Sequence, residues 1–249
     1  MSMTSANTTT VLITGANKGL GLEAARRLGV RGWTVFLGSR DESRGRAAAE
    51  GLIAEGIHAV PVSLDVTSDE SVAAAEKLVR QHTDSLDVLI NNAGTPGRGT
   101  APAEVSIDEI HAVYDTNVYG PIRVTNALIP LLRAAANPRV VMISSAGSSF
   151  SVVTDPDQPI SRIHELGYSS SKAALNMVTV RYAQALPDIK FNLATPGEIA
   201  NRKFAATDMN NNTGALTVTE GTDSILELAT LDPDGPTGTF IDRLGPVAW

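Results

Sequence analysis

The chain has 249 residues, of which 43% are hydrophobic, a formal net charge of −7 and no run of basic residues longer than a pair. Since phosphate backbones are bound by clustered Lys and Arg, and a membrane helix needs about 20 continuous apolar residues, we expect neither nucleic acid nor a membrane as partner. The absence of cysteine excludes disulfides, thiolate nucleophiles and Cys-ligated metals and is consistent with a reducing compartment, so we place the protein in the cytoplasm.

Short apolar, β-branched runs alternate along the chain with longer segments of helical spacing. After a flexible tail predicted over residues 1–9, the predicted strands are 10–14, 34–37, 59–62, 88–90, 139–143 and 190–194. The predicted helices are 20–30, 44–55, 71–82, 107–132 and 169–186. Strands that are apolar on both faces and separated by helices indicate an α/β fold, a doubly wound parallel sheet with helices on both faces. No linker or composition break divides residues 10–249, so we expect one domain.

The first predicted strand runs into a glycine-rich loop, and an amphipathic helix follows. The glycines let the backbone turn tightly and approach a pyrophosphate, which would face the helix N-terminus. A glycine cluster can also be only a tight turn, but the strand before it and the helix after it are the context that a dinucleotide site requires. The spacing Gly-x-x-x-Gly-x-Gly resembles that of the short-chain dehydrogenase/reductase family, which has a Rossmann-type fold. The loop residues expected to bind the cofactor are Gly15, Asn17, Lys18, Gly19, Leu20 and Gly21.

The end of the second predicted strand indicates which dinucleotide binds. An NAD site usually places an acidic residue there for the ribose hydroxyls, whereas an Arg suits the 2′-phosphate of NADP. Here no acid ends the strand and Arg40 follows it, while Lys18 could reach the same phosphate as a point charge. Alternatively, Asp41 could pair with Arg40 on the surface. The pattern favours NADPH as cofactor.

Further loops resemble the cofactor shell of the same family. Asp65, after the third strand, resembles the residue that hydrogen-bonds the adenine, although it could instead close a turn. Residues 91–94 read Asn-Asn-Ala-Gly, which resembles the family motif that stabilises the sheet and lets the cofactor lie close. The additional cofactor-binding residues that the resemblance implies are Val66, Asn91, Ala93, Gly94, Pro196 and Gly197.

Tyr168 and Lys172 stand four residues apart at the start of a predicted helix, so the phenol and the ammonium share one face. A cation beside a tyrosine favours the phenolate and lowers a pKa that is ordinarily about 10, which makes the residue a usable general acid and base. Such a pair occurs by chance in many helices. Two further positions match the family, however: Asn117 in the long helix and Ser145 after the fifth strand, with Ser144 as the less suitable neighbour.

The resemblance covers about residues 10–249 and implies an NADPH-dependent reductase that converts a ketone or other carbonyl to a secondary alcohol. Tyr168 would supply the proton, Ser145 would bond the substrate oxygen, and Lys172 would bond the nicotinamide ribose, with Tyr168 also at the cofactor. Asn117 would position a water that returns the proton through Lys172. The C-terminal segment looks like that of carbonyl reductases and their plant relatives, which act on ketones, quinones and terpenoid or alkaloid carbonyls.

Two alternative functions stay open: a non-catalytic NADP(H)-binding regulator, which typically loses the Tyr or the Lys, and an alcohol dehydrogenase acting in the oxidative direction. Small polar residues dominate 199–213, so we predict a mobile substrate lid there, or else an ordinary surface loop. Thr207 is displaced from the position where the family places a Thr against the nicotinamide amide. Residues 151–166 are too short an insertion to decide between a monomer and a homo-oligomer. The four histidines are scattered, so no metal site is expected.

Overall fold

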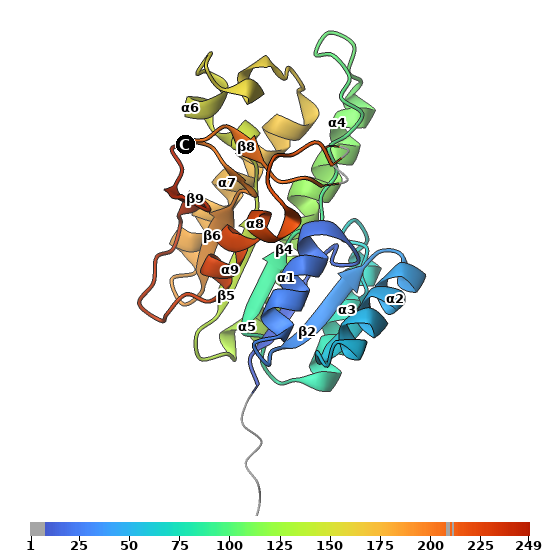
Figure 1. The fold of residues 1–249 in the computed structure, drawn as a ribbon. Helices are drawn as coiled ribbons and strands as arrows, with labels where there is room; N and C mark the ends of the chain where they lie inside the picture. Colours follow the sequence, from blue (N-terminus) through green and yellow to red (C-terminus); the bar gives the residue numbers. More distant parts are fainter. Residues whose placement is uncertain (1–7, 208–209, 211) are drawn as a thin grey trace, which may run out of the picture.

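A computed structural model describes residues 8–207, 210 and 212–249, which form a central sheet between two layers of helices (Figure 1). Within these residues the sheet has eight strands in the order β10-β9-β6-β5-β4-β1-β2-β3. Every neighbouring pair is parallel except β9 and β10. The predicted doubly wound α/β fold is therefore confirmed. The tail predicted over residues 1–9 lies outside the described residues except for its last two.

All six predicted strands are present, and two further short strands extend the sheet near the C-terminus. The strands of the sheet are β1 (Thr10–Ile13), β2 (Thr34–Ser39), β3 (Ala59–Ser63), β4 (Val88–Asn91), β5 (Arg139–Ile143), β6 (Lys190–Ala194), β9 (Phe240–Asp242) and β10 (Gly245–Pro246). A separate hairpin pairs β7 (Gly197–Glu198) with β8 (Lys203–Phe204). The short β9 was not predicted, because a three-residue run that ends in a carboxylate has no distinct strand pattern.

Helices connect the strands and cover both faces of the sheet. They are α1 (Gly19–Gly29), α2 (Glu42–Ala54), α3 (Asp69–His82), α4 (Ile107–Tyr114), α5 (Gly120–Arg133), α6 (Phe150–Val153), α7 (Gly167–Ala185), α8 (Val218–Gly221) and α9 (Asp223–Ala229). In the part of the chain that the structure describes, no helix combines the length and the apolar character needed to cross a bilayer.

The strands are buried on both faces, and alternate side chains enter two separate cores. Val11 and Ile13 of β1 pack with residues of α1, α2 and α9 on one face. Leu12, between them, packs with residues of α3, α5 and α7 on the other. This division follows from the two-residue period of a strand, whose successive side chains point to opposite sides. It explains why these strands read as continuous apolar runs.

The predicted helix over 107–132 is interrupted in the structure. Residues Asp115–Tyr119 form a π-helical turn, in which the N–H of Gly120 donates to the carbonyl of Asp115. Pro121 has no N–H to give to the carbonyl of Asn117, so the α-helical pattern cannot continue through this point. The prediction of one helix was wrong here because the apolar spacing runs across the break. Such π turns are frequent at functional sites.

Leu89→Ala should lower the free energy of unfolding by about 2–5 kcal/mol, because Leu89 is fully buried in the central strand β4 and its truncation leaves a cavity. Urea denaturation followed by circular dichroism measures the change. The control is Ile53→Ala on α2, where the side chain is 52% exposed and the expected cost is about 0.5 kcal/mol or less. Equal costs at the two positions would contradict the described core.

Candidate active site

The predicted site residues gather at the carboxyl ends of the parallel strands, around β1 and β4. From β1 the chain proceeds through β2 to β3 on one side of the sheet, and from β4 through β5 to β6 on the other. Neighbouring strands whose connections leave in opposite directions create a crevice outside their carboxyl ends, where open α/β sheets bind ligands. Here the glycine loop after β1 meets the Asn-Asn-Ala-Gly loop after β4.

Asn92 and Thr14 hold these two loops together. The Nδ2 of Asn92 donates to the carbonyls of Thr14 at 2.8 Å and Gly15 at 3.1 Å. The hydroxyl of Thr14 accepts the N–H groups of Asn92 at 3.0 Å and Ala93 at 2.9 Å. Gly15 has a φ of +62°, and a Cβ at Gly21 would lie 2.5 Å from Asn92 Nδ2, so both positions require glycine. Our sequence reasoning missed Asn92, although the second Asn of the motif was a signal for it.

Two residues predicted to bind the cofactor turn their side chains into the protein. Asn91 donates to the hydroxyl of Thr125 at 3.1 Å and to the sulfur of Met142 at 3.3 Å. Val66 is buried and packs beside Gly120, where an added Cβ would lie 2.8 Å from its Cγ2. Contact of these two residues with a cofactor stays a prediction, and only their backbone atoms are suited to it.

Arg40 lies exposed just beyond β2, and Asp41 does not pair with it. The carboxylate of Asp41 instead accepts the N–H of Arg44 at 3.0 Å, which caps α2, and pairs with the Arg44 guanidinium at 3.2 Å. The carboxylate of Asp65 closes a turn by accepting the N–H and the hydroxyl of Thr67 at 3.0 and 2.7 Å. Burial raises the pKa of Asp65, but the bonds from Thr67 and the charge of Arg40 outweigh it and hold this pKa below its ordinary value. The charge of Arg40 is thus near enough to act on Asp65.

Lys18 is the residue that precedes α1, in extended conformation, and Gly19 begins the helix. A Cβ at Gly19 would have no atom within 4 Å, so this side of the loop is open. The N-terminus of α1 carries exposed N–H groups and the positive end of the helix dipole, which suit a phosphate. The loop therefore fits the pyrophosphate of a dinucleotide.

Tyr168, Lys172 and Ser145 come together where α7 crosses the carboxyl end of β5. The ammonium of Lys172 is buried and donates to the carbonyl of Ile143 at 2.8 Å. Its Nζ lies 5.8 Å from the centroid of the Tyr168 ring. The hydroxyl of Ser145 accepts the N–H of Gly147 at 3.2 Å and lies close enough to the Tyr168 phenol to lower its pKa. Three of the four predicted catalytic residues thus lie in one place.

Burial dominates the ionisation of this group. Burial raises the pKa of Tyr168 to about 12. The interaction with Ser145 lowers this pKa, and the negative charge of Glu165 raises it. Burial also lowers the pKa of Lys172 to about 8. The expectation that Lys172 brings the Tyr168 pKa below 10 is therefore wrong for this protein without its cofactor. Tyr168 is held protonated at neutral pH, the state of a proton donor.

Asn117 lies in the π-helical turn, fully buried, and its side chain is completely engaged. Its Oδ1 accepts the N–H of Thr95 at 2.8 Å, and its Nδ2 donates to the carbonyl of Thr95 at 2.9 Å and to the hydroxyl of Ser171 at 3.0 Å. The amide thereby ties the loop after β4 to α7. The predicted water contact stays a prediction, and it would fall to the Asn117 carbonyl, which Pro121 cannot bond.

Gly94 keeps the space between Asn117 and Lys172 open. A Cβ at this position would lie 3.4 Å from Asn117 Oδ1 and 3.5 Å from Lys172 Nζ. Any side chain there would cover the ammonium from the side of the glycine loop. A glycine at residue 94 therefore fits a ligand group lying between that loop and α7.

The segment after Pro196 and Gly197 is anchored at its beginning. Glu198, buried in β7, pairs with Arg243 and, at 3.6 Å, with Lys203, and Arg243 also pairs with Asp223 at 3.1 Å.

Further on, the backbone of Leu216 closes the base of the predicted lid. Its carbonyl accepts from Ala206 at 2.8 Å, and its N–H donates to Phe204 at 3.1 Å. Residues 208, 209 and 211 lie outside the described residues, and the lid over 199–213 stays a prediction.

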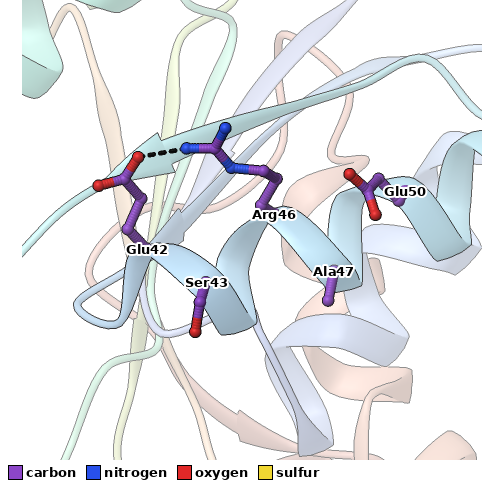
Figure 2. Close-up of a pocket in the computed structure, with 5 residues that line it drawn as sticks. All are labelled: Glu42, Ser43, Arg46, Ala47 and Glu50. Carbon is purple, nitrogen blue, oxygen red and sulfur yellow. Dashed lines mark hydrogen bonds and ion pairs between the residues drawn. The ribbon is translucent and has the colours of Figure 1, made fainter.

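A pocket on the outer surface of α2 contains none of the predicted site residues (Figure 2). Glu42 and Arg46 pair with each other across it, one helical turn apart. Its other lining residues are Ser43, Ala47 and Glu50. Over the described ranges, no three His, Asp or Glu side chains lie together as metal ligands would.

Comparison with known proteins relates the whole chain to one family. Residues 9–213 match the sequence profile of short chain dehydrogenases. Short-chain dehydrogenase/reductase 1 of Saponaria officinalis is 34% identical, over 93% of this chain and 93% of its own. The (−)-isopiperitenone reductase of Mentha piperita is 30% identical, over 93% of this chain and 95% of its own. Among solved structures, NADPH-bound carbonyl reductase from chicken fatty liver has a TM-score of 0.84 at 27% identity, covering 97% of this chain and 99% of that one.

Lys172→Met should change how stability depends on pH. The pKa of Lys172 is about 8 in the folded chain against 10.5 ordinarily. Between pH 8 and pH 10.5, Lys172 is therefore protonated in the unfolded chain and neutral in the folded chain. The free energy of unfolding of the cofactor-free wild type, minus that of Lys172→Met, should then rise by about 3 kcal/mol from pH 7.5 to 11. Denaturant titrations of both proteins across this range measure it. A difference that is constant with pH would refute the buried-ammonium assignment.

Proposed function

The chain belongs to the short-chain dehydrogenase/reductase family, and from that premise we propose that it is an NADPH-dependent carbonyl reductase. The observation that carries the proposal is the grouping of two hydroxyls, Ser145 and Tyr168, beside the buried ammonium of Lys172. These groups lie at the carboxyl ends of the strands, on the same side of the sheet as the glycine loop. A carbonyl compound bound there would meet two hydroxyl donors and a cofactor site within one crevice.

In the proposed reaction, the hydroxyls of Ser145 and Tyr168 donate hydrogen bonds to the substrate carbonyl oxygen. Bound NADPH would supply the hydride that adds to the carbonyl carbon. As negative charge develops on the oxygen, both donors stabilise it, and Tyr168 transfers its proton to complete the alcohol. Tyr168 would then regain a proton from Lys172 through the ribose hydroxyl that Lys172 would bond. A water at the Asn117 carbonyl would return the proton to Lys172.

The preference for NADPH is proposed from the charges around the adenosine end of the crevice. Arg40 is exposed and is not paired with Asp41, so its guanidinium is available for a 2′-phosphate. Lys18 would lie near the same phosphate, and Asp65 would accept from the adenine amino group. The chicken carbonyl reductase, which is described as NADPH-bound, supports this choice of cofactor.

The ionisation of Tyr168 favours the reductive direction over alcohol oxidation. Oxidation requires the phenolate as base, and burial raises the pKa of Tyr168 to about 12. The protonated phenol is instead ready to act as donor. The regulator alternative is disfavoured because both Tyr168 and Lys172 are retained. We propose a small ketone as substrate, in the class that includes cyclic terpenoid ketones, since one relative is named for the terpenoid alcohol neomenthol and another for the terpenoid ketone isopiperitenone.

Tyr168→Phe should lower kcat by about 10²- to 10⁴-fold, because it removes the proton donor, while NADPH binding should change little. NADPH oxidation with aryl ketones, quinones and cyclic terpenoid ketones measures turnover, and fluorescence titration measures binding. Tyr182→Phe is the control on the same helix, since that hydroxyl bonds Asn126 at 2.7 Å outside the site. If wild-type protein binds NADPH tightly but reduces no compound of the panel, the regulator alternative is favoured.

Arg40→Asp should reduce the ratio of NADPH to NADH affinity by about 10- to 100-fold, because a charged hydrogen bond to the 2′-phosphate is lost and a repelling carboxylate replaces it. Titrations with both cofactors give the ratio. Arg46→Asp on α2 makes the same change of charge on the outward side of the helix, in the pocket of Figure 2, and should leave the ratio unchanged. An Arg40→Asp variant with wild-type preference would show that the phosphate lies elsewhere.

A further inference from the structure

Three consecutive residues at the end of β5 each approach a different turn of α7. The carbonyl of Ile143 accepts from Lys172, the hydroxyl of Ser144 bonds the amide of Asn176 at 2.6 Å, and the hydroxyl of Ser145 lies close enough to the Tyr168 phenol to lower its pKa. Residues 168, 172 and 176 follow at intervals of four, so they lie along one face of the helix. Two of these contacts belong to the proposed reaction. The third, through Asn176, is not yet explained.

Asn176 is also connected to Ser145 by hydrogen bonds through Ser148. Its Nδ2 donates to the hydroxyl of Ser148 at 2.8 Å, and that hydroxyl donates to the carbonyl of Ser145 at 2.6 Å. The N–H of Ser148 donates to the same carbonyl at 3.0 Å. Ser144, Ser148 and Asn176 are at most 4% exposed, so none of these bonds is replaced by water.

The direction of the chain of bonds is fixed by counting hydrogens. A serine hydroxyl has one proton, and that of Ser148 is used at the Ser145 carbonyl. The Ser144 hydroxyl lies 2.6 Å from Asn176 Oδ1 and 3.0 Å from the Ser148 hydroxyl, and the shorter contact takes its proton. Ser148 then accepts from the NH₂ of Asn176 at 2.8 Å. An aspartate, which cannot donate, and an apolar side chain would both break this order.

We infer that Asn176 is a positioning residue, which sets the place of the Ser145 hydroxyl relative to Tyr168 through Ser144 and Ser148. Ser145 lies between Ser144, which follows β5, and the short turn Ala146–Ser148, so its position depends on how that turn is held. Asn176 holds both ends of the turn and belongs to the helix that carries Tyr168. It thereby ties the two proposed hydrogen-bond donors to one rigid element. The inference rests on the proposed function for its catalytic meaning.

A buried amide is costly unless its bonds are made, and the same space between helix and strand could be filled by an apolar residue. A purely structural Asn176 would stabilise the fold without regard to Ser145. A positioning Asn176 acts through Ser145, so its effect must vanish when the Ser145 hydroxyl is absent. This difference makes the two roles separable by a double-mutant cycle.

The experiment measures kcat and the KM for NADPH in Asn176→Leu, Ser145→Ala and the double variant. Asn176→Leu should lower kcat by about 10- to 100-fold, since a displacement of about 1 Å at a reacting group can cost this much. The KM for NADPH should stay within about threefold, and NADPH deuterated at the transferred position should give a larger isotope effect on kcat. In the Ser145→Ala background, Asn176→Leu should cause no further loss of kcat. Additive losses would overturn the inference.

Thr179→Val is the matched control, because Thr179 is equally buried on α7 and its hydroxyl bonds only the Leu175 carbonyl of the same helix, at 2.7 Å. It should lower the melting temperature without lowering kcat. If Asn176→Leu does not fold, Ser148→Ala removes the hydroxyl that links Asn176 to the Ser145 carbonyl and should give the same non-additive loss of kcat. A Ser148→Ala variant with wild-type kcat would overturn the inference.

A readout without turnover separates failure of this inference from failure of the proposed function. The chain has four tyrosines, so ¹³Cζ-tyrosine labelling gives few resonances, and Tyr168→Phe assigns that of Tyr168. Loss of the Ser145 hydroxyl in Ser145→Ala should shift this resonance. Asn176→Leu should shift it in the same direction, and Thr179→Val should not. A Tyr168 signal that responds to Ser145→Ala but not to Asn176→Leu refutes the positioning role, whether or not any ketone is reduced.

Discussion

The seating of α7 on the carboxyl end of β5 is the contact on which the rest of the site depends. A buried ammonium is tolerated there because the Ile143 carbonyl accepts from it, and the desolvation that this burial causes acts on Tyr168 as well. The low local dielectric strengthens the hydrogen bond of the Lys172 ammonium, and desolvation keeps the phenol protonated. One packing arrangement therefore determines both the geometry and the ionisation of the proposed donors.

The opposite wall of the crevice is built by backbone rather than by side chains. Gly15, Gly21 and Gly94 leave room where any Cβ would meet Ala93, Asn92 or Lys172, and Asn92 fixes the two loops against each other. A wall of peptide groups offers N–H donors at close range to a phosphate. The proposed catalytic side chains thus come from the β4 to β6 side of the sheet, and the backbone suited to a ligand comes from the loops after both β1 and β4, at the reversal of strand order.

The sequence predicted the features that depend on short segments: six strands, the glycine loop and the Tyr168–Lys172 spacing. It did not reveal the π-helical turn at Asp115–Tyr119, because helical spacing continues through it and only Pro121 signals the break. The sign of the Tyr168 pKa shift was missed as well, since burial is set by the whole fold. Asn92 and Asn176 escaped notice for the same reason: their partners are distant in the chain.

The hydrogen bonds of Leu216 to Phe204 and Ala206 have a consequence for how such an enzyme could diversify. They join the backbone on the two sides of this segment, so the positions at which the chain enters and leaves it are held together. The entropy of closing a loop grows only slowly with its length. Insertions and deletions between Ala206 and Leu216 should accordingly be tolerated. Natural selection could then reshape the predicted substrate lid without changing Tyr168 or Lys172.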